Sequence, residues 1–160
     1  NYKNSAVKRK AMTDWIMRAA VIDDADDLKE CMIAAYTPYV ARMGGKILPP
    51  MDVDYADEIT NYPVWVVVVN DVVVGGLIMS FEEQYASLAN LCVHPNFQGH
   101  GIGKGILDYA EKTSKQKQYS EMRLATHILL TENLSLYKHL GWSEIERDET
   151  RVYMRKSIIE

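Results

Sequence analysis

The chain has 160 residues, of which 48% are hydrophobic and 25% are charged, and its formal net charge is −4. This length and balance predict one globular domain with a sizeable core. The negative charge argues against nucleic acid as a partner, because domains that bind nucleic acid are usually basic. A mildly acidic surface would instead suit a cationic substrate.

The longest apolar run, Val64 to Val69, is far too short to span a bilayer, so no membrane partner is expected. No secretory signal pattern is visible. Cys31 and Cys92 have neither metal-binding nor redox spacing, which predicts reduced thiols and a cytoplasmic location. Residues 1–13 are polar and basic without periodicity and predict a flexible N-terminal arm or an expression remnant, followed by a single domain over residues 14–160.

The first elements of the domain are a strand and a helix. Residues 15–22 alternate loosely between apolar and polar types, as a strand does. The acidic residues in 23–27 supply an N-cap and a negatively charged first turn for a helix. Its apolar spacing continues to about Met43, and Gly44 and Gly45 end it unless Pro38 breaks it earlier.

A β-hairpin is the clearest local signal in the sequence. Residues 46–54 form a loop that is either a lid over a substrate or a rigid connector, and residues 55–61 form a short helix. The β-branched run 64–69 is typical of a strand covered on both faces, and residues 72–81 form the returning strand. Gly75-Gly76 inside that strand suggests a bulge or a close backbone approach.

A third strand, residues 86–93, runs into the glycine-rich stretch 98–105 and then into a helix. The first turn of a helix has N–H groups without partners, and glycines let a ligand reach them, so this loop predicts a phosphate or pyrophosphate site. It is not a P-loop, and Lys104 stands where a dinucleotide fingerprint needs its third glycine. A tight turn without any ligand remains the alternative.

The remaining elements are a helix, a strand, a short helix and a final hairpin. Their predicted ranges are 102–118, 122–130, 131–141, 142–146 and 151–157. The order β-α-α-β-β-β-α-β-α-β-β implies an α/β sandwich, in which about four helices flank a mixed, mainly antiparallel sheet of six to seven strands.

A second motif is the ten-residue stretch from Asn133 to Trp142. Asn133 and Tyr137 are four residues apart and share a helix face, and Leu136 and Leu140 share a neighbouring face that would pack on the sheet. A core tyrosine with a capped hydroxyl is the alternative interpretation of Tyr137. An N-cap is the alternative interpretation of Asn133.

Together the two motifs resemble the GNAT N-acetyltransferase superfamily from Trp15 to the C-terminus. Gln98-Gly99-His100-Gly101-Ile102-Gly103 matches its Gln/Arg-x-x-Gly-x-Gly/Ala loop after a Val-x-Pro strand end. The second stretch is similar to its Asn to Tyr to Gly-Phe pattern, although Trp142 replaces the usual Phe and the spacing from Asn to Tyr is one residue shorter than in some members.

The resemblance implies an N-acetyltransferase that moves the acetyl group of acetyl-CoA directly to a primary amine in a ternary complex, without a metal. Acetyl-CoA is then a cosubstrate, and the acceptor is a small molecule or a peptide that binds between residues 42–55 and the last hairpin. Homodimers are common in the superfamily, so a second copy is a partner to test for. The resemblance assigns CoA contacts to Leu91, Cys92, Val93, Gln98, Gly99, His100, Gly101, Ile102, Gly103, Lys104 and Asn133.

By the same resemblance, Tyr137 protonates the departing thiolate. The amine must also lose a proton, which costs roughly 4–5 kcal/mol at neutral pH for a lysine-like amine, so a base or a water chain is needed. Cys92 has no recognisable partner, which favours direct attack by the amine. A non-catalytic acyl-CoA-binding domain is the main alternative, and a nucleotide-dependent dehydrogenase is a distant third. The candidate bases are Glu82 and Glu83, followed by Asp52, Asp54 and His127.

Overall fold

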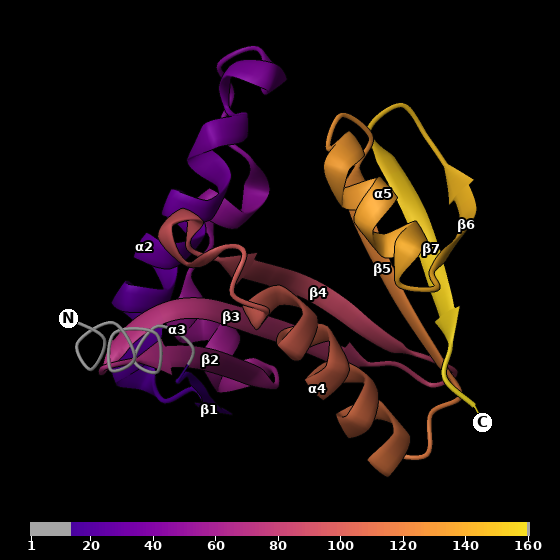
Figure 1. Cartoon of the computed structure of the whole chain (residues 1–160), viewed down its shortest axis with the longest axis horizontal. Coiled ribbons are helices and arrows are strands. Elements are labelled where there is room, and N and C mark those ends of the chain that lie inside the picture. Colours follow the sequence, from indigo (N-terminus) through magenta and orange to yellow (C-terminus); the bar gives the residue numbers. More distant parts are fainter. Residues whose placement is uncertain (1–13, 160) are drawn as a thin grey trace, which may run out of the picture.

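Within residues 14–159, the computed structural model shows a seven-stranded sheet and four α-helices, and the predicted sandwich is confirmed (Figure 1). The strand order is β1-β2-β3-β4-β5-β7-β6, and only β4 and β5 run parallel. The strands are β1 (Ile16–Ala19), β2 (Val64–Val69), β3 (Val72–Phe81), β4 (Ala86–Val93), β5 (Glu121–His127), β6 (Ser143–Arg147) and β7 (Arg151–Ser157). The helices are α2 (Ala25–Tyr36), α3 (Tyr55–Asn61), α4 (Ile102–Gln116) and α5 (Thr131–His139). The arm predicted for residues 1–13 lies outside the described residues.

Strand β2 is buried on both faces, as its sequence indicates. Val67 and Val69 belong to the core that contains α4, whereas Val66 and Val68 belong to the core that contains α2 and Tyr55 of α3. Side chains alternate between the faces of a strand, so one run of valines serves both layers. No helix among residues 14–159 is long and apolar enough to cross a membrane.

The first helix ends earlier than its apolar spacing suggests. Helix α2 stops at Tyr36, and the chain continues through single 3₁₀ turns, η2 (Thr37–Tyr39) and η3 (Ala41–Met43). Pro38 accounts for the change, because it lacks an N–H group and its ring clashes with the preceding turn of an α-helix. Gly44 and Gly45 then end the segment with φ values of 71° and 84°.

Two predicted strands are also too long. β1 ends at Ala19 because the next residues turn into η1 (Ile22–Asp24) and α2. β5 ends at His127 rather than at Leu130, because the His127 carbonyl accepts a hydrogen bond from the Leu130 amide and closes a turn.

Both explanations offered for the glycine pair in β3 hold. The β2–β3 register shifts between Val67 and Val68, beside Gly75. A Cβ atom on Gly76 would lie 2.5 Å from Cδ1 of Leu28, which is fully buried in α2. The helix therefore packs directly on the backbone of the sheet at this point.

We expect Gly76→Ala to lower the free energy of unfolding by about 1–3 kcal/mol, because Leu28 has to leave its position in a close-packed core. Urea denaturation measures the change. Gly103→Ala is the control, since a Cβ there would meet only Val93 Cγ2, at an ordinary 3.8 Å. Equal stability of the two variants would contradict the close approach of Leu28.

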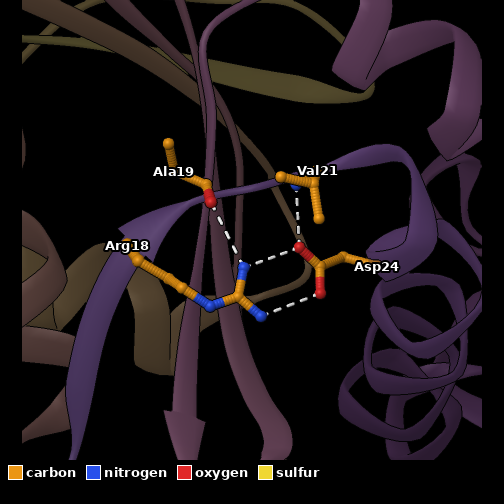
Figure 2. A network of polar contacts seen from close by, with 4 residues as sticks. All are labelled: Arg18, Ala19, Val21 and Asp24. Atoms are coloured by element: carbon orange, nitrogen blue, oxygen red, sulfur yellow. Dashed lines mark hydrogen bonds and ion pairs between the residues drawn. The ribbon is translucent and has the colours of Figure 1, made fainter.

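An ion pair joins β1 to the start of α2 (Figure 2). Arg18 donates to both carboxylate oxygens of Asp24, at 2.7 and 3.0 Å, and the Val21 amide donates to Asp24 Oδ2 at 2.8 Å. Asp24 is only 7% exposed, and the hydrogen bonds from Arg18 lower the pKa of its carboxyl group. The predicted acidic cap thus reaches back to the strand instead of capping α2 with its side chain.

Asp24→Asn should lower the free energy of unfolding by about 1–2 kcal/mol at neutral pH. The native pKa of Asp24 lies below its unfolded value of about 3.9, so its contribution is complete above that pH and is lost as the pH falls through the native pKa. Denaturation at neutral pH and at about pH 2.5 should therefore show that the variant and the wild type differ less in free energy of unfolding at the acidic pH. Asp23→Asn, at an exposed neighbour, is the control. A difference independent of pH would rule out the carboxylate as its source.

Candidate active site

A cleft opens where β4 and β5 separate. These strands pair only over Ala86–Leu88 with Met122–Leu124, and beyond that they diverge (Figure 1). On its other side β4 stays paired with β3 as far as Val93. One edge of Leu91–Val93 therefore has no strand beside it. Apart from the Leu91 carbonyl, which accepts from the Tyr36 hydroxyl, backbone groups on this edge are available to a ligand that lies along the strand.

The same cleft ends at the N-terminus of α4. The first helical hydrogen bond runs from the Gly105 amide to the Gly101 carbonyl. The amides of residues 99–104 donate to no acceptor among residues 14–159. Gly99 and Gly101 have φ values of 82° and 80°, and a Cβ atom on either would meet no protein atom within 4 Å. This loop is an open row of N–H donors at the positive end of a helix dipole.

The cleft has a volume of about 420 Å³. All but one of the predicted CoA-contact residues line it, the exception being His100, which lies between two left-handed glycines and presents no lining surface. The Lys104 side chain pairs with Asp108 at 2.9 Å and is exposed, so it is mainly a surface charge. The predicted residues on the wall are Leu91, Cys92, Val93, Gln98, Gly99, Gly101, Ile102, Gly103, Lys104, Asn133 and Tyr137.

The four glycines of the loop have different reasons to be glycine. Gly99 and Gly101 provide the left-handed backbone, and Gly103 lines the cleft. Gly105 does not line the cleft. A Cβ atom on Gly105 would lie 2.4 Å from the Trp15 ring, so this glycine makes room for a side chain and not for a ligand.

Tyr137 lines the cleft from α5. Its ring is half-buried and packs edge-on against Trp142 at 5.9 Å between centroids. Trp142 is 4% exposed and belongs to the hydrophobic core. Burial raises the pKa of Tyr137 to about 12, and its hydroxyl has no hydrogen-bond partner among residues 14–159. The ring therefore packs against the core, as the alternative interpretation held, but the hydroxyl is not capped by any of the described residues.

Helix α5 is rotated relative to the prediction. Leu130, and not Asn133, occupies the N-cap position, so the N-cap interpretation of Asn133 is wrong. Leu136 was expected to pack on the sheet but is 49% exposed and lines the cleft. Leu134 takes the buried position, and Leu140 packs against the same core. A four-residue spacing places two residues on one face of a helix but does not say which face meets the sheet.

Tyr36, at the end of α2, is a site residue that the sequence does not reveal. Its hydroxyl donates to the Leu91 carbonyl at 3.1 Å, and burial raises its pKa. Tyr36 lines both the cleft and a second pocket of about 350 Å³. In the sequence it is one more apolar-face residue of a helix, and only the fold places it between two pockets.

An ion pair connects the two sides of the cleft. Arg42, in η3, donates to both oxygens of Glu132 in α5, at 2.6 and 3.1 Å, and to the Leu129 carbonyl at 3.1 Å. The hydrogen bonds from Arg42 lower the pKa of Glu132. Within residues 14–159, Glu132 is the only carboxylate that lines either pocket, and its lowered pKa keeps it charged and makes it a weak base.

The structure does not bring Glu82 and Glu83 to the cleft, which corrects their prediction as bases. Both are exposed in the turn between β3 and β4, where the Glu82 carboxylate accepts from Ser80. The five residue-to-residue steps of β4 from Ala86 to Leu91 alone span roughly 17 Å. Glu82 and Glu83 therefore lie beside the N-terminal end of β4, whereas the cleft lies at its C-terminal end.

The other three candidate bases differ in whether they line a pocket. Asp54 caps α3 by accepting from the Asp57 amide, and neither it nor Asp52 lines the cleft or the second pocket. His127 lines the second pocket, and its Nδ1 accepts from the Leu129 amide at 3.1 Å. Of the five predicted bases, only His127 lines either of the two pockets.

A splayed sheet edge, a helix with free amides and a phenol across the cleft are features of an enzyme that binds an acyl-CoA. Residues 60–144, more than half of the chain, match the family model of the acetyltransferase (GNAT) domain. The chain therefore belongs to the GNAT acetyltransferases, and the resemblance seen in the sequence is confirmed. Among curated proteins, no sequence matches the chain.

Solved structures share this fold. The chain is similar to the PaiA N-acetyltransferase of Thermoplasma acidophilum, solved in complex with coenzyme A, with a TM-score of 0.80, 21% identity, and coverage of 90% of this chain and 99% of that one. It is also similar to the ribosomal-protein-S18-alanine N-acetyltransferase of Escherichia coli, with a TM-score of 0.74, 15% identity, and coverage of 91% and 94%. At these identities the likeness establishes the fold alone.

We expect Gly101→Ala to weaken acetyl-CoA binding by about tenfold or more, because a left-handed backbone costs a residue with a Cβ about 1–2 kcal/mol. Gly44→Ala is the matched control, since Gly44 also has a positive φ, of 71°, and an open Cβ position but does not line the cleft. Isothermal titration calorimetry on the folded variants measures both affinities. If Gly101→Ala binds as tightly as Gly44→Ala, the left-handed turn is not needed to expose the amides.

Proposed function

We propose that the chain transfers the acetyl group of acetyl-CoA directly to a primary amine in a ternary complex. The observation that carries the proposal is that one cleft combines an unpaired strand edge, a row of free amides and the Tyr137 hydroxyl. The second pocket meets this cleft at Tyr36 and lies between residues 42–55 and the last hairpin, where an acceptor was expected.

In this proposal the backbone holds acetyl-CoA. The pantetheine arm lies along Leu91–Val93 as an added strand, and the pyrophosphate accepts hydrogen bonds from amides of the α4 loop. A strand N–H group directed at the thioester carbonyl stabilises the oxyanion that forms there. Asn133, which no capping role occupies, binds the coenzyme from α5.

The amine nitrogen attacks the thioester carbonyl carbon, the carbon–sulfur bond breaks, and sulfur takes a proton from Tyr137. With a pKa of about 12, Tyr137 is neutral at physiological pH and able to donate. In water a phenol has a pKa of about 10 and a thiol a pKa of about 8.5, so complete transfer would be uphill by roughly 2 kcal/mol. Donation is therefore concerted with bond cleavage, in a cleft whose burial also raises the pKa of the thiol.

The proton that the amine loses passes to water in the cleft. A proton from this water then returns to Tyr137 and restores its phenol. Glu132 is a poor base because Arg42 lowers its pKa. Cys92 does not carry the acyl group, because the contact with Cys31 and its burial raise the pKa of its thiol and keep it protonated. This favours direct attack over an acyl-cysteine intermediate.

A second candidate is a domain that binds acyl-CoA without catalysis, and it is favoured because Arg42 pairs with Glu132, the carboxylate that lines the cleft among residues 14–159, and makes it a poor base. Release of CoA from acetyl-CoA in the presence of a panel of primary amines separates the two functions. The location in the cytoplasm and a homodimeric assembly remain predictions, which cell fractionation and sedimentation would test.

Tyr137→Phe should leave acetyl-CoA affinity nearly unchanged and lower turnover by about 10²-fold or more, because it removes a proton donor and keeps the ring. Steady-state kinetics and calorimetry measure the two effects. Wild-type turnover should also not decline between about pH 7 and 10, since Tyr137 stays protonated there. Tyr62→Phe, at an exposed phenol that does not line the cleft, is the control. Unchanged turnover in Tyr137→Phe would remove this residue from the mechanism.

A further inference from the structure

The second pocket differs in charge from the rest of the molecule. It lies between β4, the end of β5, the loop with Pro49 and Pro50, and the start of β7. From the described part of the chain, residues 14–159, no aspartate or glutamate lines this pocket, although the whole chain carries a net charge of −4. Its basic lining residues are His127 and Arg151, and the others are apolar or neutral and polar.

His127 and Arg151 are direct neighbours across the β5–β7 ladder. The Ile128 amide donates to the Thr150 carbonyl at 2.8 Å, which holds this end of the ladder closed. The two basic side chains therefore share one wall of the pocket on regular strands, a more rigid support than a loop gives.

Both side chains have hydrogen-bond donors available to a ligand. The guanidinium of Arg151 has no carboxylate within 4.0 Å among residues 14–159, where the ion pairs found involve other residues. The nearby Asp148 is engaged, since it accepts from the Thr150 and Arg151 amides and from the Tyr153 hydroxyl. Because Nδ1 of His127 accepts from Leu129, the neutral ring carries its proton on Nε2, as a donor.

The donors of His127 and Arg151 indicate which kind of amine substrate fits the second pocket. A polyamine would place a second cation in a pocket that offers it no carboxylate. An arginine fork beside an imidazole N–H matches the oxygens of a carboxylate or a phosphate. The acidic surface that would suit a cationic substrate does not extend into this pocket. The residues that line the pocket affect the binding of a charged substrate more than distant surface charges do, because salt screens distant charges.

We propose that the acceptor is a small amine that carries a carboxylate or phosphate on the same molecule, with Arg151 and His127 binding that anionic group. The inference rests on the proposed acetyl transfer and names its substrate class. The amine end then points past Tyr36 toward the cleft, and the apolar part of the molecule lies against Leu48 and Leu130.

The test compares acceptors that differ only in the anionic group. ω-Amino carboxylic acids of increasing length are paired with n-alkylamines of equal length, 2-aminoethyl phosphate is paired with ethanolamine, and spermidine represents polyamines. Rates are measured at saturating acetyl-CoA, and calorimetry measures binding to the CoA complex. At least one anionic amine should exceed its neutral partner by about tenfold or more in kcat/KM. Which series shows it distinguishes carboxylate from phosphate.

Two variants tie the preference to the pocket. Arg151→Gln should reduce the ratio of anionic to neutral kcat/KM toward one, and Arg151→Lys should retain part of it. Arg155→Gln is the matched control, because Arg155 lies four residues along the same strand face and pairs with Glu121 at 2.8 Å, away from the pocket. The ratio should survive this change.

The outcomes separate the two proposals. Equal or better use of neutral amines or spermidine would overturn the anionic class while leaving acetyl transfer intact. If no amine is acetylated, the transfer proposal fails, and calorimetry then decides the inference. Selective binding of anionic amines that Arg151→Gln abolishes would uphold it, and unselective binding would overturn it.

Discussion

The loss of hydrogen bonding between β4 and β5 beyond Leu88 and Leu124 is the constraint on which the site depends. Strands of a sheet normally satisfy each other's backbone groups, and an unpaired edge in the middle of a sheet requires a partner. Here the edge of Leu91–Val93 opens into a cleft instead of a neighbouring strand. The divergence also separates α5 from α4, so that a phenol and a helix N-terminus face one space from opposite sides.

Several contacts hold the two halves of the sheet apart yet connected. The β3–β4 register shifts between Ile78 and Met79, just before the divergence, and a bulge of this kind bends a strand and increases its twist. Helix α2 packs on the glycine backbone of β3 and carries Tyr36 to the Leu91 carbonyl. Across the opening, Arg42 forms an ion pair with Glu132. The cleft is thus bounded by packing at its base and by an ion pair at its mouth.

Features with local signals were predictable from the sequence. The β2–β3 hairpin follows from a valine run and from Asn70-Asp71, two residue types that tolerate the positive φ values of 48° and 64° found there. The glycine loop follows from the left-handed backbone it needs. Tyr36 and Arg151 were not predictable as site residues, because their positions depend on contacts between residues distant in the chain. Glu82 failed for the same reason, since following a strand does not say which end of the sheet is functional.

Burial acts on both partners in the final proton transfer, and this makes Tyr137 chemically reasonable. The same desolvation that raises its pKa disfavours the free thiolate of CoA, the alternative place for negative charge in the cleft. What matters is the difference between the two pKa values in the site, not either value in water. In the proposed substrate class, Arg151 would neutralise the anionic group in the second pocket, which shares Tyr36 with the cleft. Separate pockets therefore let a single small domain handle negative charge on both substrates without placing the two charges together.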